Sequence, residues 1–172
     1  TCEVSPHHLA LTDADVDFYD SNYKMKPPLR SAADTEALVQ GIAAGLVDAI
    51  ATDHAPHPGS EKMQEFEKCP FGIIGLETAL AVALEKLVHS GRVSLARLIE
   101  LFTTGPARIL GLNRGRLEVG APGDVTIFDP ELSWTYDVNR SFSRSKNSPF
   151  HGRTFRGGPV ATVVAGAVVW RR

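Results

Sequence analysis

The sequence predicts an α/β fold with a parallel sheet, followed by a tail built mainly of β-strands. Two short β-compatible segments, 1–4 and 48–52, are separated by a helix-like segment, which is the order of a βαβ unit. From residue 116 onward the hydrophobic period changes to two, as in strands. We therefore divide the chain into a first part, residues 1–113, and a tail, residues 114–172.

The composition is that of an ordinary globular protein. The 172 residues are 43% hydrophobic and carry a formal charge of −2, and Lys and Arg form no long cluster. This argues against partners such as nucleic acids or anionic membranes. No apolar run reaches membrane-spanning length. Cys2 and Cys69 belong to no C-x-x-C pattern, so we expect no disulfide framework or thiolate zinc site, and a cytoplasmic location.

The first predicted strand leads directly into a pair of histidines. The chain opens on Thr1 inside this strand, without an initiator Met, so we expect it to be a piece of a longer protein. After the strand we predict a turn stiffened by proline, which carries His7 and His8. Together with Glu3 these histidines are candidates either for metal ligands or for side chains that orient ligands, and we favour the orienting role.

A polar, irregular segment at residues 13–30 contains three cationic side chains. Pro27 and Pro28 hold the backbone extended, so we expect Lys24, Lys26 and Arg30 to be displayed in a fixed direction. Ammonium and guanidinium groups suit the recognition of a carboxylate. The alternative is a solvated surface loop.

Residues 31–46 predict a helix, which is followed by a strand whose carboxyl end is a candidate functional site. Ser31 and Asp34 form a capping box, after which Leu38, Ile42 and Leu46 recur at four-residue spacing. The helix leads to strand 48–52 and to Asp53, at the strand end where active sites of parallel α/β folds lie.

Asp53 and the residues after it are the strongest candidates for chemistry in the chain. A carboxylate at this position can bind a metal or transfer a proton. Pro56 stiffens the following turn, so that we expect His57 to lie near Asp53. The alternative is an aspartate that caps a helix or forms a turn, beside a solvated histidine pair.

A long polar loop at residues 57–75 has the length of a lid or binding loop. Within it, Phe71 and Gly72 combine an apolar plate with an unobstructed backbone, which suits a small planar ligand held by main-chain groups. A turn that supports a core aromatic side chain explains the same residues equally well.

The remaining elements are predicted to serve packing. Leu76, Leu80, Leu84 and Leu87 indicate a helix that ends at Gly91, Ser94 caps a second helix, and a short third helix runs from Thr104 to Gly111. In the tail, residues 124–129 predict a strand and residues 160–170 a hairpin that turns near Gly166.

Four motifs in this order resemble the carboxyl-terminal part of the bacterial class I dihydroorotases of the amidohydrolase superfamily. They are Glu-Val-Ser-Pro-His-His-Leu at 3–9, Lys-Met-Lys-Pro-Pro-Leu-Arg at 24–30, Asp-His-Ala-Pro-His at 53–57, and Pro-Phe-Gly-Ile at 70–73 with Gly-Leu-Glu-Thr at 75–78. Gly-Ala-Pro-Gly-Asp at 120–124 and Asn-Ser-Pro-Phe at 147–150 extend the resemblance into the tail.

The resemblance implies a TIM-like (β/α)8 barrel with two zinc ions, joined to a small β-sandwich. Its activity is the reversible cyclisation of N-carbamoyl-L-aspartate to L-dihydroorotate in pyrimidine biosynthesis. Asp53 matches an aspartate that binds zinc and shuttles a proton, His57 a substrate-binding histidine, and Phe71 and Gly72 a loop whose backbone contacts the pyrimidine ring. Lys26 stands where many members have Asn, so its substrate contact is open.

The resemblance also implies that most zinc ligands lie upstream of this chain. Because tetrahedral zinc needs about four ligands, we expect the chain alone to bind zinc weakly and to be inactive. The alternatives are another cyclic-amide hydrolase, of the allantoinase or dihydropyrimidinase type, and a metal-free dihydroorotase-like subunit that scaffolds aspartate transcarbamoylase. Expected partners are a small-molecule substrate, with a homodimer and a transcarbamoylase complex left open.

Overall fold

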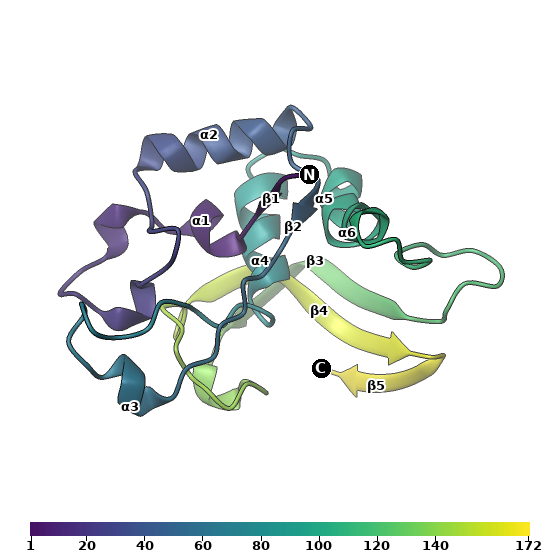
Figure 1. Ribbon diagram of the computed structural model, residues 1–172. Helices are drawn as coiled ribbons and strands as arrows, with labels where there is room; N and C mark the ends of the chain where they lie inside the picture. Colours follow the sequence, from purple (N-terminus) through teal and green to yellow (C-terminus); the bar gives the residue numbers. More distant parts are fainter.

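The first part of the chain contains the expected βαβ unit. In the computed structural model, which describes all 172 residues, strand β1 (Glu3–Val4) runs parallel to β2 (Ala49–Ile50). Glu3 lies opposite Ala49 and Val4 opposite Ile50. Helix α2 (Ala32–Ala43) lies between them in the sequence and crosses above both strands in Figure 1. The parallel pairing places the carboxyl ends of both strands at the same edge.

Helix α2 begins as predicted and ends earlier. The Ser31 hydroxyl accepts from Asp34 N over 3.3 Å, and the Asp34 carboxylate accepts from Ser31 N over 3.1 Å, which completes the capping box. Ile42 is fully buried, but Leu46, predicted to share its face, is 71% exposed. That prediction is wrong because the helix ends at Ala43 and Gly45 then turns the chain with φ of +79°.

Residues predicted as a turn after β1 form a short helix instead. Helix α1 (Pro6–Ala10) begins with Pro6, whose fixed φ suits the first helical turn, and the Ser5 hydroxyl caps it by accepting from His8 N over 3.4 Å. Leu9 on this helix enters the core. Two 3-10 turns follow, at Asp13–Asp15 and Ser21–Tyr23.

Four further helices follow β2. They are α3 (Gly59–Lys62), α4 (Ala79–Ala83), which continues into a π-helical turn at Leu84–Val88, α5 (Leu95–Phe102) and α6 (Thr104–Ile109). Ser94 caps α5 as predicted, accepting from Arg97 N over 3.2 Å. The prediction that Leu76 belongs to the same helix as Leu80 is wrong, because α4 begins only at Ala79 and Leu76 is 64% exposed.

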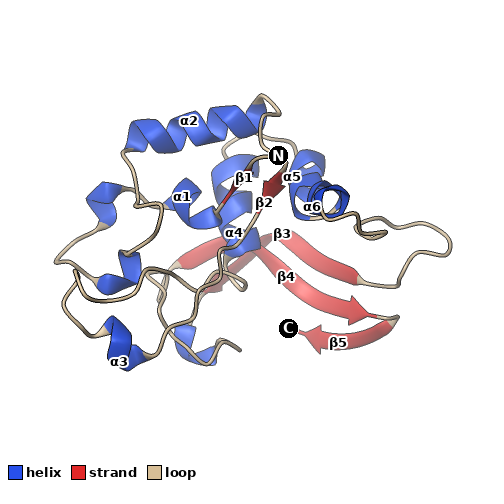
Figure 2. Ribbon diagram, viewed as in Figure 1, coloured by secondary structure: helices blue, strands red, loops and turns tan.

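The tail forms the three-stranded antiparallel sheet shown in red in Figure 2. Its strands are β3 (Val125–Thr135), β4 (Thr154–Val164) and β5 (Ala167–Arg171), in the order β3-β4-β5. The predicted hairpin is confirmed, with the turn at Ala165 and Gly166, both at positive φ. A 3-10 turn at Val138–Arg140 lies in the long connection between β3 and β4.

The first part and the tail share a hydrophobic core. One cluster of buried residues includes Met25 and Ile73 from the first part together with Phe150 and Phe155 from the tail. At Gly157 on β4 the sheet approaches the helical segment so closely that a Cβ would lie 2.6 Å from Leu84 Cδ1. The boundary between residues 113 and 114 stays a prediction, and the two sides pack as one body.

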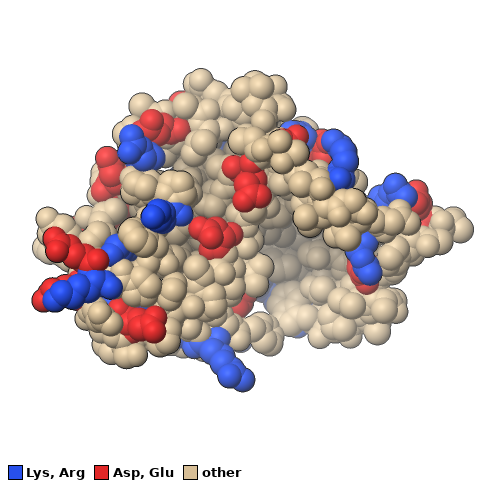
Figure 3. All heavy atoms as spheres, in the orientation of Figure 1, with Lys and Arg blue, Asp and Glu red and all other residues tan.

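The distribution of surface charge and the apolar content of the helices are relevant to the partners expected from the sequence. In Figure 3, acidic and basic side chains lie interspersed over the face that is drawn, rather than gathering into one patch. None of the helices combines the length and the apolar composition that crossing a membrane requires.

Candidate active site

Asp53 lies just beyond the end of β2 in a strained backbone conformation. Its φ is +47°, in the left-handed region that L-residues other than Gly and Asn rarely adopt. Such outliers cluster at functional sites, where the surrounding structure imposes the conformation. The side chain is exposed and lines a hollow of about 500 Å3.

Two of the three predicted cations line the same hollow as Asp53. The hollow is formed by Glu3, Val4, Ser5, His8, Lys26, Pro27, Arg30, Leu38 and Asp53. Lys26 and Arg30 are exposed, and Lys26 Nζ lies 5.6 Å from the centre of the Phe71 ring. Arg30 Nε lies 3.6 Å from the Asp34 carboxylate. Two carboxylates, Glu3 and Asp53, and two cations thus line one concavity at the strand ends.

Lys24 is not displayed with them, and that prediction is wrong. Its side chain is 8% exposed, and its ammonium donates to Phe66 O, Glu67 O and Cys69 O over 2.5, 3.0 and 2.7 Å. The loop at residues 66–71 packs over this lysine, which turns inward because three carbonyl groups converge on it.

His8 is held by hydrogen bonds on both sides of its ring. Nδ1 lies 2.7 Å from the Ser5 hydroxyl oxygen, and Nε2 donates to Pro27 O over 2.9 Å. Both nitrogens are therefore occupied within the chain, and the bond to a carbonyl oxygen places a proton on Nε2. The arrangement fits the predicted orienting role better than a ligand role, since it ties α1 to the proline segment.

His7 is enclosed in the core. It is fully buried, its ring stacks against Phe150 with centroids 6.1 Å apart, and neither ring nitrogen is paired with another side chain. Burial lowers its pKa from 6.5 to about 4, so the ring is neutral at neutral pH. Gly75 leaves room for it, because a Cβ there would lie 2.8 Å from His7 Cε1.

Phe71 and Gly72 lie on a loop segment that runs beside Asp53–His57. His54 forms a parallel bridge with Ile73, and Ala55 N donates to Ile73 O over 3.1 Å. Gly72 has φ of +129°, and a Cβ at this position would lie 2.4 Å from Ala55 Cβ and 3.3 Å from His57 Nε2. Only glycine fits where the two segments approach so closely. Phe71 is 47% exposed beside them.

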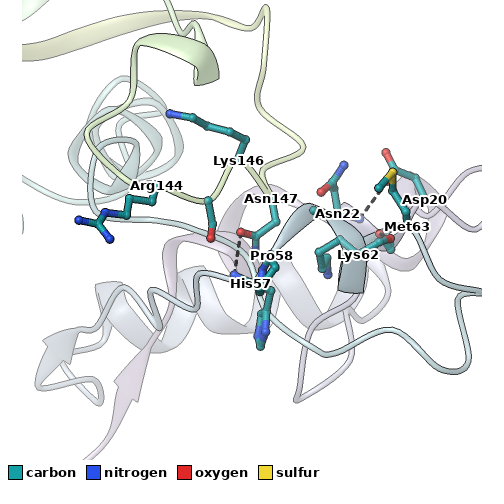
Figure 4. A pocket seen from close by; sticks show the side chains of 12 residues that line it. Asp20, Asn22, His57, Pro58, Lys62, Met63, Arg144, Lys146 and Asn147 are labelled. Carbon is teal, nitrogen blue, oxygen red and sulfur yellow. Dashed lines mark hydrogen bonds between the residues drawn. The ribbon is translucent and has the colours of Figure 1, made fainter.

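His57 lies in a second hollow, of about 410 Å3, that Asp53 does not line. Its Nδ1 lies 3.5 Å from the Glu61 carboxylate. The surrounding side chains include Asp20, Asn22, Lys62, Arg144, Lys146 and Asn147 (Figure 4). The structure therefore brings His57 together with Gly72, and it brings Asp53 together with Lys26, Arg30, Glu3 and His8.

Asn147 is a residue of this region that the sequence analysis left without a role. A dashed line in Figure 4 joins it to His57, whereas Arg144 and Lys146 point away. Its side-chain amide accepts from His57 N over 3.2 Å and donates to Ala55 O over 2.8 Å and to Gly72 O over 3.1 Å. The signal in the sequence was the Asn-Ser-Pro-Phe motif, which nothing local connects to a site 90 residues away.

Comparison with known proteins decides the family. The profile of the amidohydrolase family matches residues 7–169. The chain belongs to this family. It is 68% identical over 172 residues to a dihydroorotase from Solibacter usitatus, and 54% identical over 171 residues to one from Geobacter sp. strain M21. These alignments cover 100% and 99% of the chain, which spans 40% of the length of each relative.

Solved amidohydrolase structures have the same fold over the whole chain. An L-hydantoinase (dihydropyrimidinase) from Arthrobacter aurescens is 35% identical with a TM-score of 0.92, and covers 99% of this chain with 39% of its own. A D-hydantoinase from Thermus sp. is 26% identical with a TM-score of 0.89, and covers 98% with 39% of its own. The fold class is thereby confirmed, as part of an amidohydrolase barrel followed by a β-rich segment.

The residues of this amidohydrolase chain do not form a zinc site by themselves. The structure holds no group of three or more His, Cys, Asp or Glu side chains that could bind a metal ion. His8 is hydrogen-bonded at both ring nitrogens and His7 is sealed in the core, so neither is free to bind zinc. Asp53 and Glu3 remain as exposed carboxylates that line the hollow at the strand ends.

Proposed function

We propose that this chain is part of a dihydroorotase, which interconverts N-carbamoyl-L-aspartate and L-dihydroorotate. The relatives with 68% and 54% identity are named dihydroorotase, whereas the L-hydantoinase structure is 35% identical. This difference favours dihydroorotase over another cyclic-amide hydrolase. The amidohydrolase fold supports hydrolysis or formation of a cyclic amide in either case.

The observation that carries the proposal is the shared hollow of Asp53, Lys26 and Arg30. Dihydroorotate bears a carboxylate on its ring and carbamoyl aspartate bears two, so a binding site needs cations close to the reacting amide. An ammonium and a guanidinium supply charge-assisted hydrogen bonds to such groups. The exposed Asp53 carboxylate in the same hollow supplies a base.

Proton transfer is the chemical task assigned to Asp53. In hydrolysis, a water molecule attacks the ring carbonyl carbon and gives a proton to the Asp53 carboxylate. As the carbon–nitrogen bond breaks, Asp53 returns this proton to the departing nitrogen, and carbamoyl aspartate is released. Cyclisation follows the same steps in reverse, with loss of water. A positioned carboxylate contributes about 100- to 10,000-fold to such a reaction.

In this proposal His57, which lines the second hollow, and the backbone of Phe71 and Gly72 also contact the substrate. The His57 imidazole is assigned to the substrate carboxylate, and the backbone of Phe71 and Gly72 to the polar edge of the ring. Their adjacency supports the assignment, because a Cβ on Gly72 would lie only 3.3 Å from Nε2 of His57.

Zinc, pathway and partners belong to the same proposal. A binuclear zinc centre would take its ligands other than Asp53 from parts of the protein outside this chain. The reaction serves pyrimidine biosynthesis in the cytoplasm. A homodimer and a complex with aspartate transcarbamoylase are compatible with this assignment.

The test is turnover by the full-length protein, supplied with zinc, on two cyclic amides. Dihydroorotate and 5,6-dihydrouracil share the ring and differ in the carboxylate. The proposal expects hydrolysis of dihydroorotate with a kcat/KM at least about 100-fold higher than that of dihydrouracil, the discrimination typical of a charged contact left unpaired. A preference for dihydrouracil would indicate a dihydropyrimidinase, and no turnover of either compound would favour the scaffolding role.

A further inference from the structure

The side-chain amide of Asn147 uses its full set of strong hydrogen-bonding groups on the backbone of two other segments. Both N–H groups are donated, to Ala55 O over 2.8 Å and to Gly72 O over 3.1 Å. The amide oxygen accepts from His57 N over 3.2 Å. The residue is 4% exposed, so these groups have little access to water as an alternative partner.

The backbone of Asn147 is held in place as well. Its backbone oxygen accepts from Ile74 N over 3.0 Å, two residues beyond Gly72. The buried Phe150, three positions further along, anchors the same stretch of the tail in the core. A rigidly held amide thus bridges the segment at residues 55–57 and the segment at residues 72–74.

The two bridged segments meet at their tightest point beside this amide. A Cβ on Gly72 would lie 2.4 Å from Ala55 Cβ, and 3.3 Å from Nε2 of His57. Small shifts of one segment against the other therefore change the separation between the His57 ring and the Gly72 backbone. Misplacement by about 1 Å in a binding site can cost on the order of 100-fold in rate.

We propose that Asn147 is a positioning residue that holds His57 and Gly72 at a fixed separation and thereby sets the affinity for substrate. This inference rests on the proposed function, in which His57 and Gly72 contact the substrate. The tail then takes part in the site through Asn147, although in this proposal none of its residues contacts the substrate.

The amide is the side chain that this position requires. The substitution Asn147→Asp would keep the shape but lose both N–H donors, so the new carboxylate would face the oxygen atoms of Ala55 and Gly72. Substitution by Ala leaves Ala55 O and His57 N without a partner, and leaves Gly72 O only the ammonium of Lys62, 3.3 Å away. Asn139, an exposed asparagine of the tail that bonds only within its own turn to Asp137, offers a matched control.

The kinetic test compares Asn147→Ala, Asn147→Asp and Asn139→Ala in the full-length protein. We expect Asn147→Ala to raise KM for dihydroorotate about tenfold, as the loss of one well-placed hydrogen bond does. We expect kcat to change less than KM, because Asp53 is untouched, and Asn147→Asp to raise KM further. Asn139→Ala should leave both constants within about twofold.

A second readout does not depend on turnover. Amide hydrogen exchange, followed by mass spectrometry, should become faster in peptides covering residues 54–58 and 70–75 of Asn147→Ala, and stay unchanged in β3 and β4. If wild type does not turn over dihydroorotate, the proposed function fails, and the exchange result still decides whether Asn147 holds the two segments. Unchanged exchange in both peptides, an unchanged KM, or a uniform acceleration throughout the chain would each overturn the inference.

Discussion

The ammonium nitrogen of Lys24 lies 2.7 Å from Cys69 O and donates a hydrogen bond to it. The same group donates to Phe66 O and Glu67 O, and its nitrogen lies 4.6 Å from the centre of the Phe71 ring. Three donors are thereby matched by three carbonyl oxygens, with an aromatic face beside them.

Lys62, also buried, donates to Pro70 O over 3.1 Å and Gly72 O over 3.3 Å. Two lysines therefore hold the loop that carries Phe71 and Gly72.

We expect Lys24→Met to destabilise the protein by about 2–4 kcal/mol, because the three carbonyl groups that converge on this buried ammonium lose their donor while the aliphatic stem is kept. Urea-induced unfolding of the full-length protein measures this change. Lys68→Met, in the same loop, removes an exposed lysine paired with Glu65 and should cost less than about 0.5 kcal/mol. Equal effects of the two substitutions would show that the buried ammonium does not hold the loop.

Lys26 faces the hollow of Asp53, and we expect it to bind a substrate carboxylate. Lys26→Met should raise KM for dihydroorotate about tenfold, the value of one charge-assisted hydrogen bond, and leave kcat nearly unchanged because the contact is made in ground and transition states alike. Since Lys26 is exposed, KM of the wild type should also rise with ionic strength. A variant with wild-type KM would place the ammonium in solvent.

His7 makes the stability of the protein depend on pH. Burial lowers its pKa from 6.5 to about 4, and the nearby His8 and His54 act in the same direction. Between these values the unfolded chain binds more protons than the folded one, so stability is complete above pH 6.5 and is lost as the pH falls toward 4. The full loss amounts to about 3 kcal/mol.

Replacing the ring by a neutral side chain tests this dependence. We expect the free energy of unfolding, measured with urea, to fall by about 2 kcal/mol less in His7→Gln than in wild type when the pH is lowered from about 7 to about 5. The comparison of the two proteins removes the contribution of the other titrating groups. Parallel pH dependences would contradict a neutral, buried His7.

Local signals in the sequence predicted the elements that local physics forms. The capping box of Ser31 and Asp34, the cap of α5 at Ser94 and the turn at Gly166 are each determined within a few residues, and all three are confirmed. The parallel pairing of β1 and β2 followed from the order of strands and helix. The placement of Asp53 at the strand end followed from it in turn.

Long-range packing accounts for what the sequence analysis missed. Lys24 was expected in solvent because Pro27 and Pro28 extend the chain, and only the loop at residues 66–71 folding over it turns it inward. Asn147 reaches His57 across 90 residues, a separation over which no periodicity or cap carries information. Leu46 and Leu76 were assigned to helices because of their spacing. Helix α2 ends at Ala43, before Leu46, and helix α4 begins at Ala79, after Leu76.

The central claim is that Asp53 moves the proton in a dihydroorotase reaction, and one substitution tests it most directly. Asp53→Asn keeps the size of the side chain and removes its basicity. In the full-length, zinc-supplied protein we expect this variant to lower kcat for dihydroorotate by about 1,000-fold, within the range of general acid–base catalysis. The exposed Asp13, outside the hollow, provides the control, and Asp13→Asn should retain wild-type kcat. An Asp53→Asn variant with kcat within about tenfold of an active wild type would contradict the account.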